Sequence, residues 1–136
     1  MIRTYVDSGV LIAAARGAGK LAQRALAIIA DTASRDFVCS DYIKLETVPK
    51  PMYFGRKAEV SFYEAYFSTA VAWQSFDATD MENAFEEACR SGLSSVDAIH
   101  VVVAALSECD ELVTSEKPPS AINRTKLVRV VSIDIE

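Results

Sequence analysis

The sequence predicts an α/β domain in three layers, with a mainly parallel central sheet and helices on both faces. Short β-rich runs alternate with longer segments in which apolar residues recur at helical intervals. Glycine, proline and helix-capping residues separate these segments. The 136 residues are 51% hydrophobic and 24% charged, enough to bury one core, so we expect a single domain over residues 1–136.

The β-rich runs and the helical segments follow one another along the whole chain. We expect strands at residues 2–6, 37–40, 71–76, 112–114 and 127–131. We expect helices over residues 8–30, from Ser40 or Asp41 to Pro49, over 56–69, from Asp77 or Thr79 to Gly92, and over 96–106.

The ends of these helices carry recognisable signals. Gly17 and Gly19 divide the first helical segment into two helices. Pro49 ends the third helix, because proline has no N–H and clashes with the preceding turn. Gly92 is a C-terminal cap, and Ser94 and Ser95 each supply an oxygen that can cap the helix over 96–106.

The global composition limits the class of protein. The net charge of −5 argues against a protein that holds nucleic acid through overall basicity. Three cysteines without C-x-x-C spacing indicate buried free thiols in a reducing compartment. No apolar run approaches the roughly 18 residues of a membrane span, and the N-terminus does not resemble a signal peptide. We expect a cytoplasmic protein that does not associate with membranes.

Acidic residues adjoin several apolar segments. Asp7 follows the first strand, Glu46 lies in the helix after the second, and Asp97 opens the apolar helix over 96–106. Glu116 follows the fourth strand. Ligands of such sheets bind at the carboxyl ends of the strands, and we expect these four carboxylates to converge there. Carboxylates gathered in that way need a cation, and Mg²⁺ or Mn²⁺ prefers oxygen ligands.

The chain resembles the PIN-domain family over essentially its whole length. The resemblance rests on Asp7 with its following Ser-Gly-Val-Leu-Ile, on the helix with Glu46, on the block from Leu93 to His100, and on Leu-Val-Thr-Ser-Glu at 112–116. It implies a metal-dependent ribonuclease, most often the toxin of a VapC-like toxin–antitoxin pair. It also implies an RNA substrate, a possible antitoxin partner and a homodimer.

The resemblance assigns roles to individual residues. Asp7 and Asp97 match direct metal ligands, and Glu46 matches a ligand or the residue that orients the attacking water. Glu116 stands where the family usually has Asp, and its extra methylene puts the contact with a second metal in doubt. Ser8 and Thr114 are expected to support the carboxylates through their hydroxyl groups.

Each acid also has a structural interpretation. Asp7 could cap the following helix, and Asp97 could strengthen a helix start behind Ser94. Glu46 could be a solvated helix residue, and Glu116 a carboxylate on a surface loop. A PIN-like module that binds RNA or protein without cleaving it is therefore an alternative, as is an unrelated α/β domain whose acids are helix caps.

Several other side chains have less specific roles. Lys44, Lys50, Arg56 and Lys57 could hold phosphates near the helix of Glu46, although a solvated charged face fits equally well. His100 is the only histidine, which excludes a metal triad built on histidine, and packing or partner contact is expected of it. We expect the aromatic residues between Tyr53 and Trp73 to pack in the core or in a dimer interface.

Overall fold

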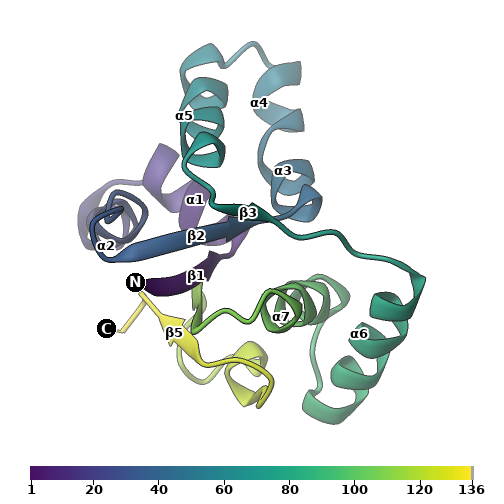
Figure 1. The fold of residues 1–136 in the computed structure, drawn as a ribbon. Helices are drawn as coiled ribbons and strands as arrows, with labels where there is room; N and C mark the ends of the chain where they lie inside the picture. The colour runs from purple at the N-terminus through teal and green to yellow at the C-terminus, as the bar shows by residue number, and fades with distance from the viewer. Residues whose placement is uncertain (136) are drawn as a thin grey trace.

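The computed structural model describes residues 1–135 and contains one five-stranded parallel sheet with the order β3-β2-β1-β4-β5 (Figure 1). Each neighbouring pair of strands runs parallel. The strands are β1 (Ile2–Val6), β2 (Arg35–Cys39), β3 (Ala72–Trp73), β4 (Glu111–Thr114) and β5 (Val130–Ser132).

The helices connect these strands in sequence order. They are α1 (Ser8–Arg16), α2 (Gly19–Ile29), α3 (Asp41–Thr47), α4 (Pro49–Tyr53), α5 (Lys57–Ser68), α6 (Ala78–Ser91), α7 (Ser95–Leu106) and the 3₁₀ helix η1 (Ala121–Arg124). Parallel strands joined by helices confirm the predicted α/β class.

The direction of the connections places the helices on the two faces of the sheet. The chain passes from β1 to β2 to β3 in one direction and continues on the other side of β1 with β4 and β5. Right-handed crossovers then place α1 to α5 against one face, and α6 and α7 against the other. Phe37 of β2 packs on Tyr66 of α5, whereas Tyr5 of β1 packs on His100 of α7. Figure 1 shows α3, α4 and α5 grouped near β3, and α6 and α7 together at the lower right of the view.

The core lies between the sheet and these helices. Fully buried apolar side chains come from the three central strands, among them Tyr5, Phe37 and Leu112. α7 contributes an almost continuous apolar surface, because most of its residues from Ala98 to Ala104 are buried. This helix is therefore the main support of the second face of the sheet.

Three of the predicted helix signals are confirmed. Asp77 caps α6 in a capping box with Asp80, and each carboxylate accepts a hydrogen bond from the backbone N–H of the other residue. Gly92 ends α6 with φ of 66°, a left-handed conformation that glycine adopts without steric cost. The hydroxyl of Ser94 accepts a hydrogen bond from the N–H of Asp97 and so caps α7.

The structure corrects other boundaries. The expected strand over 71–76 is paired only at Ala72 and Trp73, because the chain leaves the sheet beyond them. The expected strand over 127–131 is instead β5 at 130–132. Helical structure also resumes at Pro49, which is the first residue of α4. Proline is favoured at that position because the first turn of a helix needs no N–H from it.

Predictions for aromatic and cysteine residues are confirmed only in part. Tyr63 and Tyr66 are buried in the core, but Tyr53 at the end of α4 is 83% exposed. Cys39 is a buried free thiol, whereas Cys89 is exposed on α6. Periodicity did not separate these cases, because it does not show which helix face lacks a neighbour in the fold.

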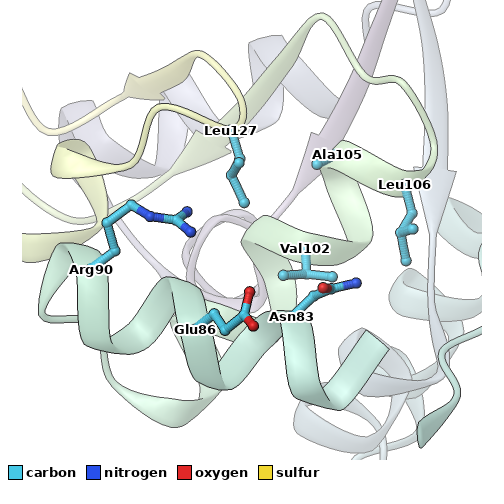
Figure 2. A pocket seen from close by; sticks show the side chains of 7 residues that line it. All are labelled: Asn83, Glu86, Arg90, Val102, Ala105, Leu106 and Leu127. Carbon is cyan, nitrogen blue, oxygen red and sulfur yellow. The ribbon is translucent and has the colours of Figure 1, made fainter. Parts of the chain in front are cut away.

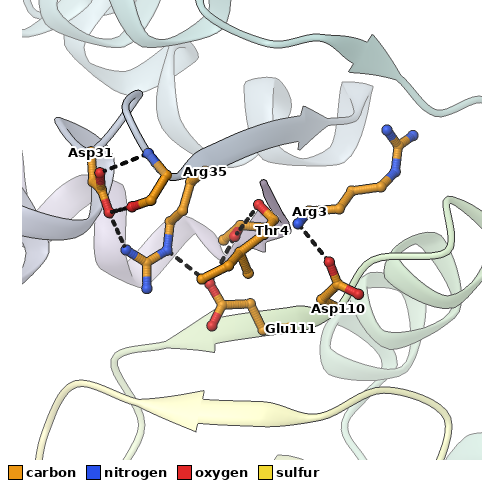
Figure 3. A network of polar contacts seen from close by, with 8 residues as sticks. Arg3, Thr4, Asp31, Arg35, Asp110 and Glu111 are labelled. Atoms are coloured by element: carbon orange, nitrogen blue, oxygen red, sulfur yellow. Dashed lines mark hydrogen bonds and ion pairs between the residues drawn. The ribbon is translucent and has the colours of Figure 1, made fainter.

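A polar network joins three strands at their amino ends (Figure 3). Glu111 is buried, and its Oε2 accepts hydrogen bonds from the Thr4 hydroxyl at 2.7 Å and from Arg35 Nε at 2.9 Å. Arg35 also donates to Asp31 at 2.7 Å. The network pairs a buried carboxylate with a guanidinium, which offsets the cost of removing both charges from water.

Within residues 1–135, no single helix is long and apolar enough to cross a membrane. Only α6 and α7 taken together reach that length and composition, and they are bent by 115° relative to each other.

Candidate active site

Three of the four predicted acids lie at the carboxyl ends of β1 and β4 or beside them. Asp7 follows β1 directly, and Glu116 follows β4 by two residues. Asp97 is in the first turn of α7, which is preceded by its cap Ser94. Because β1 and β4 are neighbours and the chain reverses its direction across the sheet there, this edge is the topological switch point. Glu46 approaches from α3.

Asp7 is buried and serves as the cap of α1. Its Oδ1 accepts a hydrogen bond from the N–H of Val10 at 3.1 Å, so the capping interpretation is correct. Burial raises the pKa of Asp7, and the negative charge of Asp97 raises it further. The neighbouring Thr114 side chain, the hydrogen bond from Val10 and the proximity of His100 only partly offset these effects.

Asp97 and Glu116 lie close enough to interact electrostatically. Burial raises the pKa of Glu116, and the charges of Asp97 and then Asp7 add to the effect. Neighbouring carboxylates repel one another when ionised, so a proton or a cation near them would be stabilising. The three acids therefore interact as one negatively charged group.

Glu46 is connected to this group through His100. Glu46 Oε1 lies 2.5 Å from His100 Nε2, and His100 Nδ1 lies 2.7 Å from the hydroxyl of Tyr5. His100 also acts electrostatically on Asp7. The sequence predicted packing for His100 and missed this contact. A signal was present, because His100 follows Asp97 by three residues and therefore shares a face of α7 with it.

The donor atoms of this group suit a hard divalent cation in charge and chemical type. The mutual repulsion of Asp7, Asp97 and Glu116 favours nearby positive charge, which such a cation would supply. However, these carboxylates do not form a complete set of metal ligands in the structure. Within the described chain, no three histidine, cysteine, aspartate or glutamate side chains are placed to hold a metal ion as they stand. Side-chain rotation would have to bring the carboxylates together around it.

The supporting residues differ in their contacts. Thr114 is fully buried, and its hydroxyl accepts a hydrogen bond from the N–H of Glu116 at 3.1 Å. Its side chain also favours the ionised form of Asp7, so Thr114 acts on two of the acids. Ser8 begins α1 and is half-buried, and within residues 1–135 its hydroxyl makes no hydrogen bond. The predicted role is therefore matched by a contact only for Thr114.

The basic residues predicted near Glu46 lie along α3, α4 and the start of α5. Lys44 is on α3 with Glu46, Lys50 is on α4, and Lys57 begins α5. All are exposed, as is Arg56, whose guanidinium lies 5.5 Å from the ring centre of Phe54. They form a basic surface beside Glu46, apart from the acidic group.

A groove of about 310 Å³ lies elsewhere, between α6 and α7 (Figure 2). Its sides are formed by the second half of α7 and by α6, with Leu127 and Arg90 at one end. None of the four acids lines it. The candidate site is an open edge of the sheet rather than this groove.

Comparison of sequences assigns the chain to no family, since no protein-family model and no curated protein matches it. Comparison of structures does find similar folds. A chain of VapBC2 from Rickettsia felis, bound to a DNA fragment from their promoter, has a TM-score of 0.71 at 12% identity over 96% of this chain and 98% of that one. DNA-bound VapBC from Salmonella typhimurium gives 0.69 at 13% identity, over 98% and 99% of the two chains.

A third similar structure is PAE2754 from Pyrobaculum aerophilum, with a TM-score of 0.55 at 18% identity, covering 95% of this chain and 90% of that one. At these identities the comparisons establish the fold. The three-layer arrangement over nearly the full length is the PIN-like α/β fold that the sequence resemblance implies.

Proposed function

We propose that this protein is a PIN-family endoribonuclease that needs Mg²⁺ or Mn²⁺ and acts as the toxin of a toxin–antitoxin pair. The observation that carries the proposal is the mutual repulsion of Asp97, Glu116 and the buried Asp7, at the switch point of a PIN-like sheet. Acids with unbalanced negative charge at that position are typical of a site for a divalent cation and a phosphodiester.

The residues have distinct roles in this proposal. Asp7 and Asp97 would hold the metal, Glu46 would hold it or orient the attacking water, and Glu116 would support a second ion or the outer shell. A bound Mg²⁺ or Mn²⁺ would make water a better nucleophile and stabilise negative charge on the phosphate. The bond from the N–H of Val10 holds the Asp7 carboxylate at the start of α1, and the neighbouring Thr114 favours its ionised form.

The direct test is cleavage of labelled RNA with Mn²⁺ by the wild type and by Asp97→Asn. We expect cleavage that a chelator abolishes and that falls by at least about 100-fold in the variant, as for loss of a metal ligand. Asp77→Asn is a matched control, because it neutralises a helix-capping carboxylate on α6 outside the site. Cleavage that persists in Asp97→Asn or in chelator would contradict the proposal.

Two observations favour a second function, a module that binds RNA without cleaving it. The acids are not placed as a closed ligand set, and Glu116 replaces the usual Asp. RNA binding without cleavage under any divalent metal would support this alternative. Glu116→Asp then becomes the informative variant, because a gain of cleavage would identify the longer side chain as the cause.

The basic surface beside Glu46 is proposed as the region that holds the RNA backbone. Lys44, Lys50, Arg56 and Lys57 are exposed there, next to the exposed ring of Tyr53. Such cations bind phosphates, and an exposed ring offers a face on which a base can stack.

The contribution of this surface can be measured by the salt dependence of RNA affinity. Lys50→Ala and Lys57→Ala should each reduce the slope of log affinity against log salt by about 1 if one phosphate contact is lost. Lys126→Ala, at an exposed lysine after η1, is the matched control and should leave the slope unchanged. Equal slopes for all variants would place the RNA elsewhere.

The proposed partners are an antitoxin and a second copy of the chain. The similar structures from Rickettsia felis and Salmonella typhimurium are VapBC assemblies on DNA, and this supports an antitoxin here. Its arginine or lysine side chains would pair with the carboxylates and block the site. Co-expression with the protein of an adjacent small reading frame should suppress RNA cleavage, and light scattering of the isolated chain measures whether it forms a homodimer.

A further inference from the structure

A chain of hydrogen bonds leads from the core to Glu46. Ser40 Oγ lies 2.8 Å from the hydroxyl of Tyr5, which lies 2.7 Å from His100 Nδ1. His100 Nε2 lies 2.5 Å from Glu46 Oε1. Ser40, Tyr5 and His100 are at most 1% exposed, so water does not compete for their polar atoms. Of these four residues, only Glu46, at the end of the series of hydrogen bonds, has a side chain that reaches solvent.

These four residues come from elements that converge at the candidate site. Tyr5 is on β1, two residues before Asp7, and Ser40 lies between β2 and α3, at the N-cap position of α3 but without a capping bond from its side chain. His100 lies one turn after Asp97 on α7. This series of hydrogen bonds therefore links the strand that precedes Asp7 and the helix of Asp97 to the helix of Glu46.

Each hydrogen bond in this series can be assigned one donor and one acceptor. An ionised Glu46 only accepts, so Nε2 of His100 is the donor. Nδ1 can then accept from the Tyr5 hydroxyl, whose oxygen accepts in turn from Ser40. Within residues 1–135, Glu46 Oε2 makes no hydrogen bond, so one carboxylate oxygen is held and the other is left for a ligand.

Packing alone does not require this arrangement. A buried histidine needs partners for its two nitrogens, but a buried hydroxyl or carbonyl would satisfy Nε2 as well as a half-exposed carboxylate on another helix. Here both contacts of the ring are with side chains, and the second one is Glu46. The ring is fixed on one side by Tyr5 and can therefore fix the carboxylate on the other.

We propose that His100, held by Tyr5 and Ser40, is a positioning residue that orients the Glu46 carboxylate toward the group formed by Asp7 and Asp97. This inference rests on the proposed function, because it assigns the orientation a role in binding the divalent cation and in RNA cleavage. Without the bond from His100, Glu46 would rotate freely on the exposed side of α3.

The contact itself can be tested by nitrogen NMR of the imidazole. Because His100 is the only histidine, labelling all histidine with ¹⁵N gives signals from this ring alone. Glu46→Gln should shift the Nε2 signal, whereas Glu64→Gln, at an exposed glutamate on α5, should not. An unchanged Nε2 signal in Glu46→Gln would overturn the proposal.

The positioning role can be tested by kinetics with substitutions along the chain. His100→Leu should lower kcat for RNA cleavage by about 10- to 100-fold with little change in KM, as for residues that orient metal ligands. His100→Gln, which keeps an amide donor, should recover part of the loss. Tyr5→Phe should lower kcat, while Tyr63→Phe removes an equivalent hydroxyl bonded to Glu59 outside the site and should not. Equal kcat in His100→Leu and the wild type would overturn the proposal.

Calorimetric binding of Mn²⁺ separates failure of this inference from failure of the proposed function. Weaker Mn²⁺ binding in His100→Leu, by about 10-fold or more, would support the inference even if the wild type cleaves no RNA. Unchanged Mn²⁺ affinity in His100→Leu would overturn it, even if the wild type is an active nuclease. Thermal unfolding of each variant shows whether a loss reflects the fold rather than the site.

Discussion

Asp7 has two functions in this structure, and two substitutions separate them. It caps α1 through the bond from Val10 N–H at 3.1 Å, and it contributes a buried negative charge beside Asp97. Asp7→Asn keeps an oxygen for the cap and removes the charge. Asp7→Ala removes both. RNA cleavage should be lost in both variants, but their stabilities should differ.

The expected difference in stability follows from the cap. Loss of an aspartate cap costs about 1 kcal/mol, so Asp7→Ala should be less stable than Asp7→Asn by about that amount. For a domain of this length the difference corresponds to roughly 3 to 5 °C in Tm. Folding raises the pKa of Asp7 above 3.8, so its ionised form opposes folding once the pH exceeds the raised value. Asp7→Asn should therefore be at least as stable as the wild type at pH 7.

Thermal unfolding at pH 7, together with RNA cleavage, measures both effects. The same two substitutions at Asp77, which caps α6 through the N–H of Asp80, should reproduce the difference in Tm without loss of cleavage. Equal Tm values for Asp7→Asn and Asp7→Ala would refute the role of the cap. A marked loss of stability in Asp7→Asn would refute the argument that the buried charge opposes folding.

Three further predictions concern stability away from the candidate site. Burial opposes ionisation of Glu87, but hydrogen bonds, the strongest from Thr125 at 2.6 Å, lower its pKa below the ordinary 4.5. The ionised Glu87 should stabilise the fold above pH 4.5, and this stabilisation should be lost as the pH falls through the lowered pKa. Glu87→Gln should therefore cost about 2 kcal/mol of stability at pH 7 and less in acid. Denaturant unfolding at both pH values measures the difference. Arg35→Met should cost about 3 kcal/mol of stability, because it leaves the buried Glu111 without its cation. The double variant with Glu111→Leu should recover much of that stability in the same denaturant assay. Gly92→Ala should cost about 1 kcal/mol at φ of 66°, and Gly92→Asn less, as thermal unfolding of the two variants can establish.

The fold class was predictable because its signals are local. Alternation of β-rich runs with helical periods requires no knowledge of distant contacts, and the caps at Asp77, Gly92 and Ser94 act within a few residues of their own position. The short strand at Ala72 and the new helix at Pro49 were not predictable in the same way. Strand length depends on the partner strand, and Pro49 can end one helix or begin another according to where the chain must turn.

The candidate site shows the same division. Asp7, Asp97 and Glu116 could be placed near one another from the sequence, because the carboxyl ends of parallel strands meet at one edge. The path from Ser40 through Tyr5 and His100 to Glu46 could not, because it joins residues up to 95 positions apart.

The sequence by itself therefore determined the alternation of strands and helices, the helix ends and the presence of acids at the strand ends. These depend on backbone geometry and on neighbours along the chain. Only the tertiary structure decided which acids act on each other electrostatically, which tyrosines are buried, and that the single histidine contacts Glu46. Those properties depend on packing across the sheet, where a side chain meets residues that the local sequence does not specify.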